Sequence, residues 1–301
     1  MIESVAFAGL GAVGAIYAQP ACLLSQVPCY AIVRNKQSYL DHPVSVNGER
    51  LKMEMINPEE AEKPASLVIV AVKWHTFPEV LEQIAPVVGE GTIILSLLNG
   101  ISSEQVIRSR FPQARVLLAM CSGVDSNRQG RAVCMNRRGR IVFGETDGRI
   151  SEAVADVAAY FDLAGIPYDT PRDMLHQMWW KLMVNVGMNQ VSAVTGLHYE
   201  GVRSNPAVME QMHRAQREVI DIANALGITM DERDIEAWDK QLDTLCCDGL
   251  SSTLQDIRAK RKTEVELYGE TICRLGKSLG IETPENRRLA ERIREIESEY
   301  L

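Results

Sequence analysis

The sequence has 301 residues, enough for two domains that each bury a core of their own. Its 46% hydrophobic and 24% charged residues are typical of a globular protein, and a formal net charge of −8 excludes a global basic field for nucleic acid or an anionic membrane. The seven cysteines include no CxxC pair, so we expect reduced thiols and no metal site. The first residues lack the features of a signal peptide or a membrane span, which predicts a cytoplasmic protein.

Residues 5–18, VAFAGLGAVGAIYA, combine an apolar strand, a glycine-rich turn and a helix of small residues. Gly9 permits a tight turn, Gly11 lets a pyrophosphate approach the backbone, and Gly14 lets the helix pack closely on the strand. The helix N-terminus adds N–H groups and a positive dipole end. An ordinary strand-to-helix turn is the alternative. The predicted cofactor turn consists of Gly9, Leu10, Gly11, Ala12, Val13 and Gly14.

The second predicted strand, CYAIV at 29–33, is followed by Arg34, Asn35 and Lys36. In NAD-binding domains a carboxylate about 20 residues beyond the glycines binds the ribose hydroxyls. Here basic groups stand instead, and a guanidinium suits the 2′-phosphate of NADP. We therefore expect NADP as the cofactor, with Arg34 at its phosphate, although a solvated basic turn would give the same pattern.

The remaining elements of the first domain follow from apolar runs and turn signals. Asn47-Gly48 predicts a β-hairpin within residues 44–56. Apolar strands are predicted at 66–73, 92–100, 115–120 and 140–145, with intervening helices and a closing helix over 151–164. Such alternation is typical of a parallel sheet covered on both faces. Residues 1–171 are therefore predicted to form a Rossmann-type domain.

Residues 172–301 have long helical periods and no convincing strand. Helices are predicted over 173–194, 206–226, 231–242 and 252–279, and a charged amphipathic helix over 287–301. The fold class is therefore α/β, with a Rossmann-type parallel sheet followed by an all-helical domain. The apolar surface of the helices is sufficient for a homodimer but does not demand one.

Two polar positions directly follow predicted parallel strands. Lys73 ends one strand, and Asn99-Gly100 ends the next. Ligands of open parallel sheets lie beyond the carboxyl ends of the strands. We therefore place Lys73 near phosphate or carboxylate charge and Asn99 near the nicotinamide half of the cofactor, although both residue types are also common where strands end.

The segment WWKLMVNVGMNQVSAVTG places polar residues on a largely apolar helix. At 100° per residue, the side chains of Lys181, Asn185, Asn189 and Ser192 fall within an arc of about 80°. A lysine and two asparagines on a buried helix need polar partners. The stripe is therefore predicted to face a polar ligand, and an exposed polar stripe is the alternative.

The helix predicted from Ser251-Ser252 onward carries a carboxylate near its apolar face. Ser252 and Gln255 have capping-box spacing. Glu264 falls within about 50° of the centre of the apolar face, where a carboxylate needs a cation or a hydroxyl donor. Arg261 on the same face would satisfy it structurally, and a bound ligand is the other explanation.

Together these features resemble the ketopantoate reductase (2-dehydropantoate 2-reductase) family along essentially the whole chain. The resemblance rests on GLGAVG at 9–14, Arg34, Lys73, Asn99-Gly100, the WxKLxxNxxxN helix at 179–189, and SSTLQDIRAKRKTEVE at 251–266. The last two motifs are far more specific than the glycine turn.

The resemblance implies hydride transfer from NADPH to the C2 carbonyl of 2-dehydropantoate, giving (R)-pantoate for pantothenate and coenzyme A synthesis. It implies Lys181 as the general acid, Asn185 and Asn189 as substrate ligands, Ser252 at the substrate carboxylate, and Glu264 at the nicotinamide ribose side of NADPH. A fixed ammonium suits this reaction because it stabilises and protonates the developing alkoxide. A cleft between the domains is the expected place for the two reactants.

Three positions depart from the family pattern. Leu98 stands where many members have Gln, Asp125 where a small residue is usual, and Tyr199 where some members have Asn. Reduction of a different small 2-oxo acid therefore stays open as an alternative. A non-catalytic NADP-binding sensor is more remote, because a sensor needs no lysine directed at a substrate carbonyl.

Overall fold

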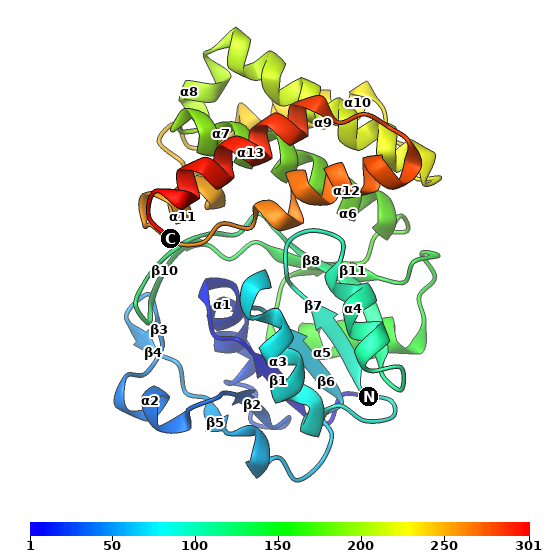
Figure 1. The fold of residues 1–301 in the computed structure, drawn as a ribbon. Coiled ribbons are helices and arrows are strands. Elements are labelled where there is room, and N and C mark those ends of the chain that lie inside the picture. Colours follow the sequence, from blue (N-terminus) through cyan, green and yellow to red (C-terminus); the bar gives the residue numbers. More distant parts are fainter. The chain divides into compact units, whose positions relative to one another are not determined.

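The computed structural model describes residues 1–301, which form two compact units, Met1–Met174 and Leu175–Leu301. All strands lie in the first unit, and the second is helical (Figure 1). The predicted fold class, a parallel-dominated sheet followed by a helical region, is confirmed. No helix combines the length and the apolar character needed to cross a bilayer.

The main sheet of the first unit has eight strands in the order β12-β11-β8-β7-β6-β1-β2-β5. The six neighbouring strands β8, β7, β6, β1, β2 and β5 all pair in parallel. Strand β11 pairs antiparallel to β8, and β12 pairs parallel to β11. Every residue of β1, β6 and β7 is buried, as expected for strands covered on both faces. The strands are β1 (Val5–Ala8), β2 (Cys29–Ile32), β5 (Glu54–Ile56), β6 (Leu67–Val70), β7 (Ile93–Ser96), β8 (Arg115–Ser122), β11 (Arg140–Gly144) and β12 (Tyr168–Asp169).

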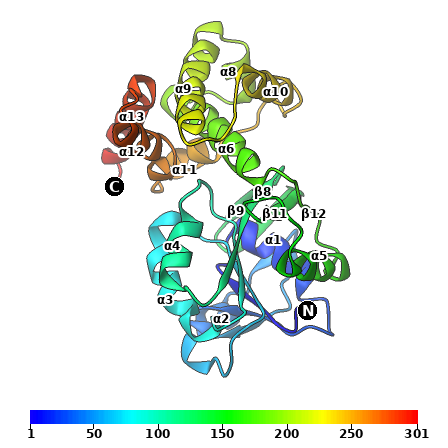
Figure 2. The same cartoon turned by 90° about the vertical axis from the view of Figure 1, so that its right-hand side faces the viewer.

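Helices cover both faces of this sheet, with α1 and α5 on one side and α3 and α4 on the other (Figure 2). Alternation along β1 builds two cores, because Phe7 packs with the α1 and α5 side chains while Ala6 and Ala8 pack with those of α3 and α4. The helical elements are α1 (Ala12–Ala21), α2 (Lys36–Asp41), α3 (Phe77–Ile84), α4 (Ser103–Arg110) and α5 (Glu152–Ala164), with short 3₁₀ turns η1 (Pro58–Glu60), η2 (Trp74–Thr76) and η3 (Ala85–Val87).

A second, four-stranded sheet has the order β4-β3-β10-β9. Its strands are β3 (Ser45–Val46), β4 (Glu49–Arg50), β9 (Asp125–Gln129) and β10 (Ala132–Arg137). The predicted hairpin is confirmed, since Asn47 and Gly48 have φ of 49° and 82° between the antiparallel β3 and β4. The β9–β10 hairpin was not predicted, because its strands are largely polar and exposed. Both hairpins pack against α1.

The second unit contains long helices and several short ones. The predicted helices at 206–226 and 231–242 correspond to α9 and α10, and the C-terminal charged helix corresponds to α13. The elements are α6 (Met174–Val184), the π-helical turn η4 (Asn185–Asn189), α7 (Gln190–Thr195), α8 (Tyr199–Arg203), α9 (Pro206–Ala225), α10 (Glu232–Leu242), α11 (Ser252–Arg258), the 3₁₀ turn η5 (Val265–Leu267), α12 (Gly269–Leu279) and α13 (Pro284–Ser298).

The single helix predicted over 252–279 is wrong. The helix ends at Arg258, and Lys260 adopts a left-handed φ of 51°. Arg261 folds back onto Asp256, with its backbone N–H on the Asp256 carbonyl oxygen at 2.8 Å and its Nε on the carboxylate at 2.9 Å. The exposed residues 258–261 have no apolar face to bury, so local polar contacts end the helix. The helix cap is also displaced by one residue, since Ser251 rather than Ser252 accepts the capping hydrogen bond from the Leu254 N–H.

Candidate active site

The glycine turn between β1 and α1 leaves no room for side chains. Gly9 has φ of 95°, and a Cβ there would lie 2.3 Å from Val72 Cγ1 and 2.5 Å from the Ala71 carbonyl oxygen. A Cβ on Gly14 would lie 2.0 Å from the Gly9 carbonyl oxygen. The turn is therefore compressed between the end of β6 and the first turn of α1, which only glycine allows.

Gly11 occupies a more open position at the start of α1. It is the N-cap of the helix, makes no side-chain capping hydrogen bond, and is followed by a first turn without an acidic residue. A Cβ on Gly11 would lie 3.5 Å from Nη1 of Arg128, which belongs to β9 and donates from Nε to the Gly130 carbonyl oxygen at 2.8 Å. The α1 N-terminus and a guanidinium thus lie together, an arrangement suited to phosphate. Sequence reasoning missed Arg128, because nothing local connects a polar hairpin residue with position 11.

Strand order brings the other predicted cofactor residues to the same sheet edge. The strands β7, β6, β1 and β2 are consecutive neighbours and all parallel, so their carboxyl ends lie side by side. Asn99 follows β7, Lys73 follows β6, and Arg34 follows β2, with the glycine turn after β1 between them. From β1 the chain builds β2 and β5 on one side and then crosses over to β6 on the other side, so β1 borders the point where nucleotides bind in such sheets.

Arg34 presents its guanidinium to solvent. The side chain is 78% exposed and pairs with the exposed Glu79 carboxylate at 3.2 Å. An ion pair this exposed contributes little stability, so exchanging Glu79 for a phosphate costs little. Lys36 differs, since its ammonium pairs with Glu60 at 3.1 Å and its backbone N–H donates to Asn57. Of these two cations, Arg34 is therefore the more accessible to a phosphate group.

Two of the departures from the family pattern lie in this unit. Leu98 is 3% exposed and packs in the core beneath α3, so an apolar residue there fills space. Asp125 lies at the exposed start of β9, where its carboxylate accepts from Asn136 Nδ2 at 3.3 Å. The third, Tyr199 in the second unit, donates through its hydroxyl to the Leu250 carbonyl oxygen at 3.4 Å and supports the chain before α11.

In the second unit, α6 and η4 carry the predicted lysine and asparagines. Lys181 and Asn185 are half-buried, and Asn189 is buried. Helix α6 is anchored to α10, because Trp180 Nε1 donates to the Asp234 carbonyl oxygen at 3.1 Å. Asn185–Asn189 form a π-helical turn, a feature that occurs frequently at functional sites.

Ser192 does not extend this polar stripe toward a ligand. It is fully buried, and its hydroxyl donates to the Leu197 carbonyl oxygen at 2.7 Å. The prediction is wrong for Ser192, because its buried hydroxyl already donates to a backbone carbonyl group just beyond the end of α7.

The structure joins Asn189 with Ser252, which are 63 positions apart in the chain. Asn189 Nδ2 donates to Ser252 Oγ at 3.4 Å, and Ser252 is exposed in the first turn of α11. Glu264 lies in the irregular segment before η5 and is 4% exposed, so its predicted helical position is wrong while its predicted burial is correct. Arg261 pairs with Asp256.

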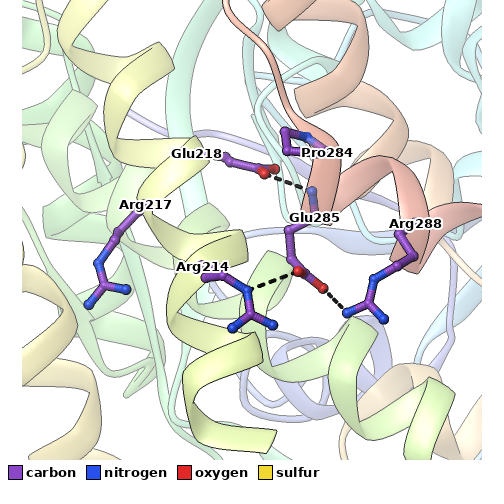
Figure 3. Close-up of a pocket in the computed structure, with 6 residues that line it drawn as sticks. All are labelled: Arg214, Arg217, Glu218, Pro284, Glu285 and Arg288. Atoms are coloured by element: carbon purple, nitrogen blue, oxygen red, sulfur yellow. Dashed lines mark hydrogen bonds and ion pairs between the residues drawn. The ribbon is translucent and has the colours of Figure 1, made fainter. Parts of the chain in front are cut away.

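A pocket between α9 and the start of α13 contains none of the predicted site residues. Figure 3 shows Arg214 and Arg288 directed at the Glu285 carboxylate, and Glu218 directed at the Glu285 backbone N–H. Burial opposes ionisation of Glu285, but hydrogen bonds from Arg288 and Arg214 lower its pKa overall. Arg214 and Arg288 share the Glu285 carboxylate, and Arg217 pairs with Glu232 outside the pocket, so each arginine already has a carboxylate partner. The ion pairs with Glu285 join α9 to α13, which is a structural role.

Comparison with known proteins assigns both units to one family. Residues 5–148 match the family model described as Ketopantoate reductase PanE/ApbA, and residues 173–297 match Ketopantoate reductase PanE/ApbA C terminal. The chain belongs to the ketopantoate reductase family. The two matches span the candidate cofactor turn and the Lys181–Glu264 region, respectively.

Similar family members cover the full chain. The 2-dehydropantoate 2-reductase of Archaeoglobus fulgidus is 25% identical over 301 residues, 99% of each chain. A crystal structure of a PanE/ApbA family ketopantoate reductase from Ralstonia eutropha JMP134 is 26% identical, with a TM-score of 0.86 over 99% of each chain. D-mandelate dehydrogenase, in a ternary structure with NADH and anilino(oxo)acetate, has a TM-score of 0.89 over 99% of each chain at 20% identity, which shows the shared fold alone.

Proposed function

We propose that this protein is an NADPH-dependent 2-dehydropantoate 2-reductase that produces (R)-pantoate. The observation that carries the proposal is the polar group on η4 and α11, where Asn189 and Ser252 come within 3.4 Å of each other in a chain of the ketopantoate reductase family. Two hydrogen-bonding side chains held together suit a substrate that has a carboxylate beside a carbonyl group.

The first unit has a cradle that fits a dinucleotide. Side chains at Gly9 and Gly14 would collide with backbone, and Gly11 keeps the α1 N-terminus open. We assign the pyrophosphate to this turn with Arg128 beside it, and the 2′-phosphate of NADPH to Arg34. Lys73 and Asn99 follow neighbouring strands, and we assign Lys73 to phosphate or carboxylate charge and Asn99 to the nicotinamide half. Glu264 of the second unit is assigned to the nicotinamide ribose side.

The chemistry assigned to the second unit is proton transfer. When bound, NADPH supplies a hydride to C2 of the oxo acid. The Lys181 ammonium stabilises the negative charge that develops on the carbonyl oxygen and gives it a proton, which completes the hydroxyl group. Asn185 and Asn189 donate hydrogen bonds that orient the substrate, and Ser252 binds its carboxylate.

A different 2-oxo acid is the second candidate substrate. Tyr199 supports the chain leading into α11, so the support of Ser252 differs from the usual family pattern, and Leu98 departs from that pattern within the core of the first unit. The shared fold of D-mandelate dehydrogenase gives no further information about substrate.

Steady-state kinetics test the proposal. Purified protein is assayed for NADPH oxidation with 2-dehydropantoate and a panel of linear, branched and aromatic 2-oxo acids. We expect the highest kcat/KM with 2-dehydropantoate. A higher kcat/KM with another oxo acid would favour the second candidate. Tight NADPH binding without turnover of any oxo acid, over the pH range where the fold persists, would favour a sensor instead.

A further inference from the structure

Gln190, directly after the η4 turn, is a buried residue to which sequence analysis gave no role. Its side chain is fully buried, and its backbone N–H donates to the Gly187 carbonyl oxygen. In a regular α-helix that N–H would instead bond the carbonyl group of residue 186. Here the side chain does so, since Gln190 Nε2 donates to the Val186 carbonyl oxygen at 2.9 Å. The side-chain amide therefore replaces a backbone hydrogen bond that the π-helical turn displaces.

A buried asparagine on α13 fixes the orientation of this amide. Gln190 Nε2 also donates to Asn286 Oδ1 at 2.9 Å. Asn286 Nδ2 donates to the Ala215 carbonyl oxygen at 3.0 Å and to the Glu218 carboxylate at 2.7 Å. A carbonyl group and a carboxylate can only accept, so the Asn286 amide cannot be reversed and its oxygen must face Gln190. Gln190 therefore has to present its NH₂ group to both Asn286 and the η4 turn.

Glu218 of α9 anchors this chain of hydrogen bonds at the N-terminus of α13. Its carboxylate accepts from the backbone N–H groups of Glu285 at 2.7 Å (Figure 3) and of Asn286 at 3.0 Å. The N-cap residue Thr283 makes no side-chain capping hydrogen bond, so Glu218 takes that role from another helix. A helix N-terminus favours a negative charge. The Glu218–Asn286–Gln190 chain thus runs from a fixed charge to the η4 turn.

The orientation of Gln190 leaves one polar atom without a partner. Gln190 Oε1 is buried and makes no hydrogen bond. The start of α12 packs directly on it, because a Cβ at Gly269 would lie 2.1 Å from this oxygen. A buried amide oxygen without a donor is unfavourable, and each such group requires an explanation. The explanation here is that the NH₂ group of the same amide is needed at the Val186 carbonyl oxygen.

We propose that Gln190 is a positioning residue for the substrate, which holds η4 in its π-helical form and thereby fixes Asn185 and Asn189. This inference rests on the proposed function. Because a π-helix and an α-helix have different numbers of residues per turn, relaxation of η4 would change the direction of Asn189 relative to Asn185. With Gln190 in place, both amides meet the oxo acid without further ordering.

The kinetic test compares two glutamine variants. Gln190→Met keeps the length of the side chain and removes the amide. We expect KM for the oxo acid to rise about fivefold, as for loss of one hydrogen bond, while the NADPH dissociation constant stays within twofold of wild type. Gln216→Met is the matched control, because Gln216 is also fully buried and touches η4 at Gly187, but its amide makes no hydrogen bond. Equal KM changes in both variants, or no KM change in Gln190→Met, would overturn the proposal.

A second variant tests the Glu218–Asn286–Gln190 chain from its other end, also where Gln190→Met does not fold. Asn286→Ala removes the group that orients Gln190, while Glu218 still accepts from the backbone N–H groups of residues 285 and 286. Gln190 keeps the Val186 carbonyl oxygen as a partner, so the expected rise in KM is smaller, about threefold. A wild-type KM in Asn286→Ala would contradict a role of the chain in positioning.

A structural readout separates this inference from the proposed function. Crystal structures of wild type and Gln190→Met, or Asn286→Ala, are compared over Asn185–Asn189 without substrate. We expect the π-helical turn in wild type and, in the variants, a backbone N–H of residue 190 that moves toward the Val186 carbonyl oxygen and an Asn189–Ser252 separation other than 3.4 Å. If wild type reduces no oxo acid, the proposed function fails, while these structures still test the positioning. An unchanged η4 turn in the variants contradicts it.

Discussion

The two units present their candidate residues in different ways. In the first unit, Arg34, Lys73 and Asn99 stand at the ends of regular neighbouring strands, so the sheet topology positions them. In the second, Asn189 and Glu264 lie in a π-helical turn and an irregular segment, where tertiary contacts position them. Regular geometry is sufficient for a cofactor common to many enzymes, whereas irregular geometry can be adjusted to one substrate. We therefore expect substrate specificity to depend on the second unit.

Among the effects on cofactor binding, glycine substitutions in the first unit provide the largest expected one. Gly14→Ala introduces a Cβ 2.0 Å from the Gly9 carbonyl oxygen, so the turn must shift. We expect the NADPH dissociation constant to rise at least about a hundredfold and the melting temperature to fall. Gly11→Ala is the matched control, because its Cβ meets only Arg128 at 3.5 Å and Ala71 at 3.9 Å. It should weaken NADPH binding and leave the melting temperature nearly unchanged.

Arg34 tests whether the first unit selects NADPH. Arg34→Ala removes the exposed guanidinium and should raise the NADPH dissociation constant about tenfold or more, while NADH binding changes by less than twofold. Fluorescence titration with both cofactors measures the difference. Lys36→Ala is the control, since its ammonium already pairs with Glu60. Equal losses for NADPH and NADH would show that Arg34 does not bind the 2′-phosphate.

Substitution of Arg128 tests the proposed pyrophosphate site, to which the β9–β10 hairpin contributes this guanidinium. Arg128→Ala removes the Nη1 atom beside Gly11 and should weaken NADPH and NADH equally, by about fivefold, because both cofactors have the same pyrophosphate. The loss should shrink at high salt. Arg137→Ala, in the neighbouring strand, serves as the control. A loss confined to NADPH would move Arg128 to the 2′-phosphate instead.

Substitution of the buried Glu104 should leave cofactor binding nearly unchanged and alter how the free energy of unfolding depends on pH. Burial raises the pKa of Glu104 to about 7 against an ordinary value of 4.5. Because the folded state binds this proton more tightly, the free energy of unfolding falls as pH rises through this interval, by about 3 kcal/mol in total. Urea unfolding at pH 5 and pH 8 should reveal the fall in wild type and a smaller one in Glu104→Gln. The exposed Glu82→Gln should retain the wild-type pH dependence.

Elements that depend on local sequence were predicted well. The Asn47-Gly48 turn and the apolar strand at Leu67–Val70 follow from backbone preference and burial on both faces. Glu264 was placed on a helix that does not form, because its surroundings depend on the contact between Arg261 and Asp256. Arg128 lies beside Gly11 through packing of a hairpin on α1, a contact between distant positions that no local pattern contains.

Substitution of Lys181 tests the proposal that the first unit binds the cofactor and the second unit supplies the proton. Lys181→Met retains the aliphatic part of the side chain and removes the ammonium, so the proposed proton donor is lost from the second unit while the glycine turn of the first is untouched. The measurement is the single-turnover rate of NADPH oxidation with 2-dehydropantoate, recorded beside the NADPH dissociation constant. We predict a rate lower by about a thousandfold with NADPH affinity within twofold of wild type. A rate within tenfold of wild type would contradict the assignment of the chemistry to Lys181.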